Sequence, residues 1–177
     1  QSDNDIYLNL YIDSTIRVKL AQTTVTLRVE TRYPWEDRVK ITVTPEKSAV
    51  FGLCLRVPEW CGKDRQFLLN GTTPDIEDRP GFYACFAQMW KAGDTVEMTL
   101  PMEVRRTESH PAVRANTGRV ALQRGPIVYC LEGTDNEGHA RSLALPRDAK
   151  LEALFRPDLL GGVTVLKGVA QLATREG

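Results

Sequence analysis

The sequence predicts an all-β protein: an antiparallel β-sandwich of jelly-roll-like type, followed by a second, smaller β block. This second block is either complete by packing on the first or the incomplete start of a second sandwich. Three observations predict this class. Apolar and polar residues alternate with a period of two through most of the chain. Turn signals such as Tyr33-Pro34 and Leu100-Pro101 recur at short spacing. A helical pattern is confined to one short segment, so many short strands joined by tight turns are expected.

Residues 24–30 are typical of the predicted strands, with Val25, Leu27 and Val29 on one face and polar side chains on the other. Such alternation indicates a strand with one buried and one solvated face. The Asn70-Gly71 pair marks a hairpin turn. The predicted strands of the first block cover residues 6–12, 15–20, 24–30, 38–44, 50–57, 66–71, 81–87 and 94–100.

Two blocks are expected, with a β-sandwich over residues 1–105 and a second β block over 106–177. In the second block, residues 148–156 predict a short helix between Asp148 as N-cap and Pro157 as stop. Residues 162–172 predict a last strand. The second block has too few predicted strands to form a hydrophobic core of its own. The second block therefore either packs on the first or begins a second sandwich.

Composition excludes several classes of protein. Lys plus Arg equals Asp plus Glu at 23 each, whereas nucleic-acid binders carry a basic surface. No apolar run approaches the ~18 residues of a membrane-spanning helix. The first residues lack the basic and apolar segments of a signal peptide, which slightly favours the cytoplasm. A mature or excised fragment would lack these segments as well, so the compartment stays open. We therefore expect neither a nucleic-acid partner nor a membrane.

The four cysteines are Cys54, Cys61, Cys85 and Cys130. They form no C-x-x-C motif, and Cys54 and Cys61 do not have a usual zinc spacing. A chain of this length does not need a disulfide framework. We expect buried free thiols, which is the common state of cysteine in protein cores.

No catalytic motif stands out. The two histidines, His110 and His139, lie in predicted loops and have no nucleophile at a recognisable spacing. Phosphate-binding and dinucleotide-binding glycine motifs do not occur. Acidic residues are frequent, but no spacing singles out the carboxylate pair of a glycosidase. The sequence therefore predicts no catalytic residue and no metal ligand in this chain.

Aromatic residues at strand ends are the candidate substrate-binding residues. Tryptophan at such positions often caps a core with its ring inward and its N–H exposed, and we favour this interpretation. The alternative is a stacking platform for sugars. The candidates for such a platform are Trp35, Trp60, Trp90 and Tyr83.

Seven segments, read in order, resemble the C-terminal β-sandwich region of the β-L-arabinofuranosidases of glycoside hydrolase family 127. The resemblance covers nearly the whole chain. The segments are YLNLYIDS (7–14), YPWEDRVKITV (33–43), LRVPEWCG (55–62), WKAGDTVEMTLPMEVRR (90–106), HPAV (110–113), GRVALQRGPIVYCLE (118–132) and DLLGGVTVLKG (158–168).

The resemblance implies that catalysis belongs to another part of the family's proteins, an N-terminal (α/α)₆ barrel. There a zinc-bound cysteine is the nucleophile and a glutamate is the general acid and base. The family's zinc ligands include an adjacent Cys-Cys pair, which this chain lacks. No catalytic residue or zinc ligand is therefore transferred to this chain. Cys130 and Glu132 fall in the sandwich motif; we expect a Gly125-Pro126 bulge to turn Cys130 inward and Glu132 outward.

Three functions follow as hypotheses. The first is a non-catalytic sandwich portion of a retaining glycoside hydrolase that supports the catalytic barrel or its dimerisation. The second is a carbohydrate-binding module for arabinan-type plant glycans. The third is a protein–protein interaction domain that uses an open strand edge. The expected partners are the upstream barrel, a second copy in a homodimer, and carbohydrate.

Overall fold

The structure is a computed structural model that describes residues 4–172, and it confirms the all-β class. The described residues form 15 strands and three short 3₁₀ helices. None of their helices is long and apolar enough to cross a membrane. The chain divides into two compact units, Gln1–Met102 and Glu103–Gly177, and each is described by itself.

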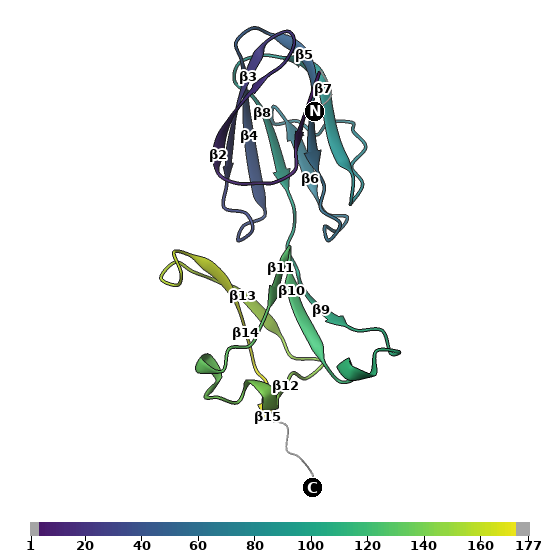
Figure 1. Ribbon diagram of the computed structural model, residues 1–177, viewed down its shortest axis with the longest axis vertical. Helices are drawn as coiled ribbons and strands as arrows, with labels where there is room; N and C mark the ends of the chain where they lie inside the picture. Colours follow the sequence, from purple (N-terminus) through teal and green to yellow (C-terminus); the bar gives the residue numbers. More distant parts are fainter. Residues whose placement is uncertain (1–3, 173–177) are drawn as a thin grey trace. The chain divides into compact units, whose positions relative to one another are not determined.

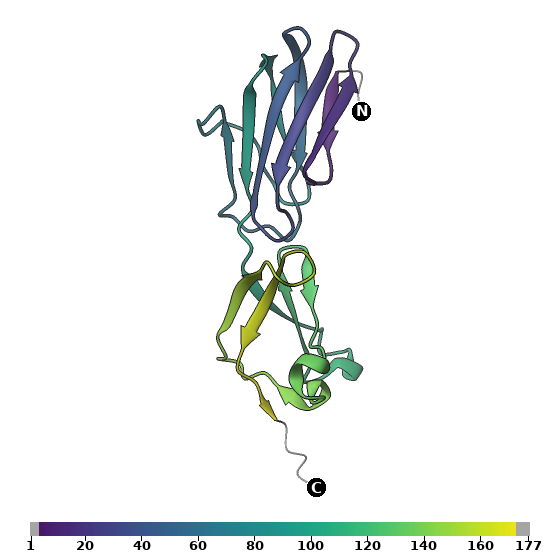
Figure 2. The same ribbon diagram turned by 90° about the vertical axis from the view of Figure 1, so that its left-hand side faces the viewer.

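The first unit consists of two sheets (Figures 1 and 2). One sheet has the strand order β1-β5-β7, and the other has the order β2-β3-β4-β8-β6. All pairings in this unit are antiparallel except that of β1 with β5, which is parallel. The strands are β1 (Asp5–Leu8), β2 (Ser14–Lys19), β3 (Thr24–Thr31), β4 (Arg38–Pro45), β5 (Ala49–Arg56), β6 (Gln66–Leu69), β7 (Tyr83–Trp90) and β8 (Asp94–Thr99).

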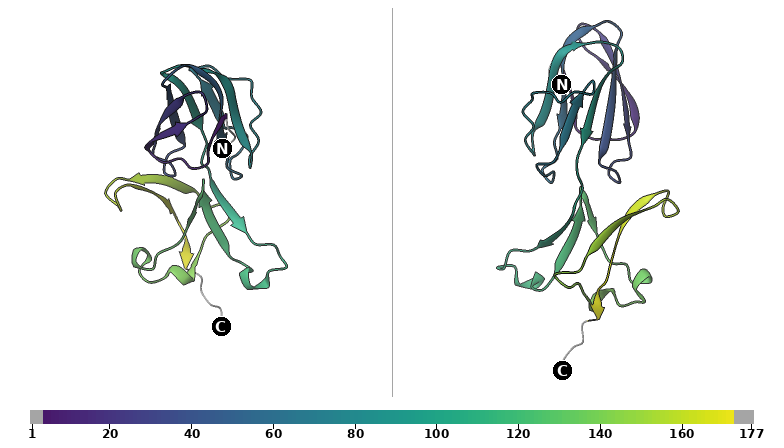
Figure 3. Two further views of the ribbon diagram at one scale, coloured as in Figure 1. Left: turned by 45° about the horizontal axis from the view of Figure 1, so that its top comes forward. Right: turned by 180° about the vertical axis from the view of Figure 1, so that it is seen from behind.

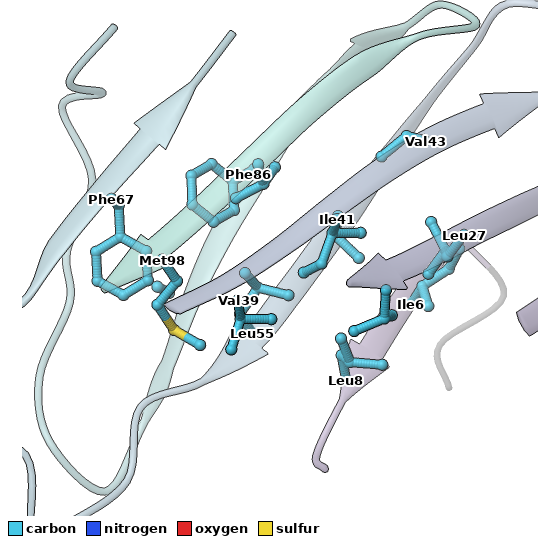
Figure 4. Close-up of a cluster of buried hydrophobic side chains, with 14 of the residues drawn as sticks. Ile6, Leu8, Leu27, Val39, Ile41, Val43, Leu55, Phe67, Phe86 and Met98 are labelled. Carbon is cyan, nitrogen blue, oxygen red and sulfur yellow. The ribbon is translucent and has the colours of Figure 1, made fainter. Parts of the chain in front are cut away.

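The core of the first unit lies between these two sheets. Alternation places Val25, Leu27 and Val29 of β3 inward, where they are fully buried as predicted. Side chains from both sheets meet in Figure 4, for example Phe86 of β7 and Ile41 of β4. This arrangement gives a β-sandwich, because each sheet covers the apolar face of the other.

The predicted strand 6–12 is shorter in the structure, since β1 ends at Leu8. Beyond it the alternation reverses: Tyr11 is buried, whereas Leu10 and Ile12 are exposed. The Tyr11 hydroxyl donates a hydrogen bond to the carbonyl of Arg56, and burial raises the pKa of Tyr11 above its usual value. A single buried aromatic side chain therefore anchors the segment that follows β1.

Gly52 is required where β1 runs alongside β5. Its amide donates to the carbonyl of Asn4 and to Oδ1 of Asp5. A Cβ atom at Gly52 would lie 2.5 Å from that carboxylate oxygen. The close approach of a polar side chain to the backbone explains the glycine inside a strand.

The second unit contains three small sheets with the orders β11-β10-β9, β13-β14 and β12-β15 (Figure 3). Its three 3₁₀ helices are η1 (Arg114–Asn116), η2 (Thr134–Asn136) and η3 (Ala140–Ser142). Its strands are β9 (Val104–Glu108), β10 (Val120–Arg124), β11 (Ile127–Tyr129), β12 (Leu143–Ala144), β13 (Leu151–Arg156), β14 (Val163–Gly168) and β15 (Gln171–Leu172).

The second unit has no buried apolar side chain among its described residues, 103–172. Its buried positions in that range are Gly125 and Thr164. Several apolar side chains are more than half exposed instead, and Leu160 is 87% exposed. The strands of this unit are therefore paired within small sheets, but no second layer buries the apolar side chains on the faces of these sheets.

The predicted helix over 148–156 is wrong. Leu151–Arg156 forms β13, which pairs in antiparallel register with β14. The segment is rich in Leu, Glu and Ala, which favour helices. A helix of this length is only marginally stable alone, however, and a neighbouring strand satisfies every second backbone group. The predicted last strand, 162–172, is present as β14 and β15.

The predicted bulge at Gly125-Pro126 is also wrong. These two residues form the turn of a hairpin, because Arg124 pairs with Ile127 across β10 and β11. Gly125 has a φ of 56°, and a positive φ at the first central position is typical of a II′ turn. With no extra residue to re-phase the strand, Cys130 is exposed rather than turned inward. Glu132 is exposed, as expected.

Candidate functional site

Zinc does not fit the residues described here. Among residues 4–172, no three side chains of His, Cys, Asp or Glu lie close enough together to hold a metal ion. Structural and catalytic zinc sites need three or four such ligands around one point.

Trp90 belongs to the core of the first unit. It is fully buried, and its ring stacks on Phe51 with 5.6 Å between the ring centroids. Its indole nitrogen donates to the carbonyl of Phe51 over 2.9 Å. With its ring enclosed and its one donor engaged, Trp90 has no surface for a ligand in this conformation.

Trp35 and Trp60 are partly exposed, whereas Trp90 is buried. Trp60 is partly buried and packs against the core of the first unit, as does Tyr33. Burial raises the pKa of Tyr33 above its usual value. Trp35 lies in the turn after β3, where its amide donates to the carbonyl of Arg32. Neither Trp35 nor Trp60 is among the residues that line the hollow around Tyr83.

Tyr83 lines a solvent-open hollow of about 580 Å³ beside the three-stranded sheet of the first unit. Its ring meets that of Tyr7 edge to face, with the centroids 5.1 Å apart. Its hydroxyl donates to Oδ1 of Asn9 over 2.5 Å. The full lining is Tyr7, Asp75, Ile76, Glu77, Arg79, Phe82, Tyr83 and Cys85.

The segment before β7 supplies the charged wall of this hollow. Arg65, whose side chain is only 11% exposed, forms an ion pair with Asp78 at 2.8 Å and also donates to the carbonyl of Asp78. Glu77 pairs with Arg79 at 3.1 Å. The Arg79 guanidinium also lies over the ring of Phe82, 4.9 Å from its centroid. These contacts fix a segment that has no regular secondary structure of its own.

A disulfide joins Cys54 of β5 to Cys85 of β7, which corrects the expectation of four free thiols and no disulfide framework. The two residues are directly opposite in the antiparallel register, with Cα atoms 4.1 Å apart. They are 31 residues apart in sequence, so pattern alone did not reveal the pairing. Cys61 is buried as expected.

Sequence reasoning missed most of the hollow because its residues come from separate segments. Tyr7 alternates with the buried Ile6 and Leu8, so its outward direction was readable from the sequence. The parallel pairing that aligns β1 with β5, and hence brings Tyr7 near Tyr83, was not. Asp75 and Glu77 carried only the signal of a polar loop.

Comparison with known families accounts for most of the chain. The family model described as "Beta-L-arabinofuranosidase, GH127 middle domain" matches residues 5–102. The model described as "Glycoside hydrolase family 127 C-terminal domain" matches residues 104–166. The chain belongs to glycoside hydrolase family 127. It contains the middle domain of the family followed by C-terminal domain sequence, which confirms the resemblance seen in the sequence.

Several members of family 127 are similar to this chain. A GH127 β-L-arabinofuranosidase from Geobacillus stearothermophilus T6 superposes with a TM-score of 0.90 and 45% identity, over 99% of this chain and 28% of that one. The GH127 β-arabinofuranosidase BT3674 gives a TM-score of 0.87 and 31% identity, over 96% of this chain and 29% of that one.

A curated family 127 relative is the non-reducing end β-L-arabinofuranosidase of Bifidobacterium longum subsp. longum. It is 34% identical over 151 residues, which is 78% of this chain and 22% of that protein. The chain therefore spans between a fifth and a third of the length of the family 127 proteins it matches.

Proposed function

We propose that this chain is the non-catalytic β-sandwich portion of a retaining β-L-arabinofuranosidase, and that it supports the catalytic barrel of the whole protein. The observation that carries the proposal is the match to the middle and C-terminal domains of family 127, over less than a third of its relatives.

The open faces of the second unit support an attachment to further polypeptide. Val128, Leu131, Leu160 and Val169 are each more than half exposed, and the unit buries no apolar side chain among residues 103–172. Exposed apolar groups of this kind mark interaction surfaces. We propose that the second unit is the start of a second sandwich, and that the remainder of the parent enzyme covers these faces.

A domain exchange tests the supporting role. The corresponding segment of the Geobacillus stearothermophilus enzyme, to which this chain is 45% identical, is either deleted or replaced by residues 1–177. The deletion variant should be insoluble or lose nearly all hydrolysis of a chromogenic β-L-arabinofuranoside. The replacement should restore a large share of both solubility and activity.

The matched control is the 177-residue chain alone, which should release no chromophore. Activity of the isolated chain would contradict the non-catalytic assignment. An undiminished deletion variant would contradict the supporting role. Sedimentation of the isolated chain distinguishes the occupant of the open faces, because a stable dimer would assign them to a second copy rather than to the parent enzyme.

A further inference from the structure

We propose that the hollow lined by Tyr7, Asp75, Glu77, Arg79, Phe82 and Tyr83 is a binding site for a neutral saccharide. The site lies within residues 5–102, the stretch that matches the middle domain of family 127. The residues that line the hollow support a saccharide as ligand, and only the choice of an arabinoside as the probe rests on the proposed function.

The size of the hollow suits a small ligand. Its volume of about 580 Å³ lies within the range of small-molecule sites, roughly 300–1,000 Å³. It opens to solvent rather than into the core, so a chain of sugar units can enter without a change in the fold. A site of this shape accommodates one or two units of a longer oligosaccharide.

The aromatic residues provide the apolar half of the recognition. Tyr7 and Tyr83 stand at 90° to one another, and the exposed ring of Phe82 lies beside them in the lining. Sugar rings carry a face of C–H groups with a small positive charge, which is attracted to the negative face of an aromatic ring. The Arg79 guanidinium covers one face of Phe82, and the two tyrosines contact one another edge to face. The remaining exposed parts of these rings are the surface that favours a ligand with an apolar face.

The charged residues provide the polar half and select against other ligands. The carboxylates of Asp75 and Glu77 accept hydrogen bonds, whereas the Arg79 guanidinium donates them. Sugar hydroxyls both donate and accept, so they match a wall that carries both kinds of group. The lining carries two carboxylates and one guanidinium, an excess of one negative charge, which disfavours an anion. A wholly apolar ligand would leave three charged groups desolvated.

The site is preformed, which reduces the entropy lost on binding. The hydrogen bond from Tyr83 to Asn9 fixes one ring. The Arg65–Asp78 pair fixes the segment that carries the charged residues. The disulfide from Cys85, one of the lining residues, fixes β7 against β5.

Isothermal titration of the 177-residue chain with an L-arabino-oligosaccharide tests the proposal, with glucuronate as an anionic comparison. We expect millimolar or tighter binding of the oligosaccharide and weaker binding of glucuronate. Phe82→Ala should weaken oligosaccharide binding by about fivefold or more, the value of one aromatic contact. Met89→Ala is the matched control, because Met89 lies on β7 with a similar exposure, 54% against 58% for Phe82, but does not line the hollow.

Glu77→Gln is a second variant, since its side chain is 76% exposed and its replacement leaves the fold intact. It should weaken binding severalfold through the loss of a charged acceptor. A flat titration, or equal affinity of wild type, Phe82→Ala and Glu77→Gln, would reject the site. Normal activity of the domain-exchange enzyme together with a flat titration would reject the saccharide site and leave the proposed function in place.

Discussion

The two units of this chain use the same local structure and reach different degrees of burial. Both are built from short strands with antiparallel partners. The first unit stacks two sheets and fully buries large side chains such as Trp90, Phe51 and Leu27. The second unit, over residues 103–172, buries no apolar side chain. Strand pairing alone therefore does not make a core, because each sheet needs a second layer over its apolar face.

Polar contacts join separate segments of the second unit. Arg106 of β9 donates to the carbonyls of Pro146 and Ala149, across some 40 residues of chain. Arg156 forms two hydrogen bonds with Asp158, and this pairing lowers the pKa of the Asp158 carboxyl to about 2. The Arg156–Asp158 pair is largely exposed, so it stabilises less than a buried apolar cluster.

The largest expected contrast between the units comes from removing one aromatic ring from each. Trp90→Ala removes a fully buried ring stacked on Phe51 and should lower the free energy of unfolding by about 3–5 kcal/mol. Phe155→Ala removes a partly exposed ring and should lower it by about 1 kcal/mol. Urea unfolding followed by circular dichroism measures both. Equal losses of unfolding free energy in the two variants would contradict the difference in burial between the two units.

The cysteines give the next largest contrast. Cys54→Ser removes the disulfide across β5 and β7 and should destabilise the first unit by about 2–4 kcal/mol. Cys130→Ser alters an exposed thiol in the second unit and should change stability by less than about 0.5 kcal/mol. Non-reducing mass spectrometry verifies the bond, and thermal unfolding measures the effect. If the Cys54→Ser variant were as stable as the Cys130→Ser variant, the disulfide would not stabilise the first unit.

A smaller effect is expected from the polar contacts of the second unit. Arg106→Ala leaves the carbonyls of Pro146 and Ala149 without their donors and should cost about 1.5–3 kcal/mol. Arg106→Lys should not rescue it, because a lysine cannot reproduce the two-pronged geometry. The neighbouring Arg105→Ala is the control, since Arg105 is exposed. NMR chemical shifts of residues 144–150 would show whether the segment loosens only in the Arg106 variants.

The sequence predicted the first unit better than the second for a physical reason. Alternation reports on burial, and strands such as β3 and β4 bury every second residue, so their pattern was readable. In β13 no residue is buried, so the alternation gave no signal. Composition then indicated a helix, whereas pairing with a neighbouring strand decides the structure. The exposed position of Cys130 was missed because a Gly-Pro pair can form either a bulge or a hairpin turn, and the sequence alone does not distinguish them.

The candidate site was the least predictable part. Tyr83 was recognised as a candidate, but its neighbours Tyr7 and Arg79 reach it only through tertiary structure. Trp90 was a candidate by residue type and position, yet its environment in the core differs from that of Tyr83 at the surface. Residue type and period indicate which face a side chain takes, whereas the pairing of distant strands determines which side chains meet.

Native-state hydrogen exchange of the 177-residue chain tests the central claim most directly, because it measures the opening free energy of each unit in one experiment. Amides of β3, β4, β5 and β8 should exchange only through global unfolding of the first unit. Amides of β9, β10, β13 and β14 should exchange at least about a hundredfold faster. Equal protection of the two sets would contradict the account, since the second unit would then be as stable as the first without a second layer over its sheets.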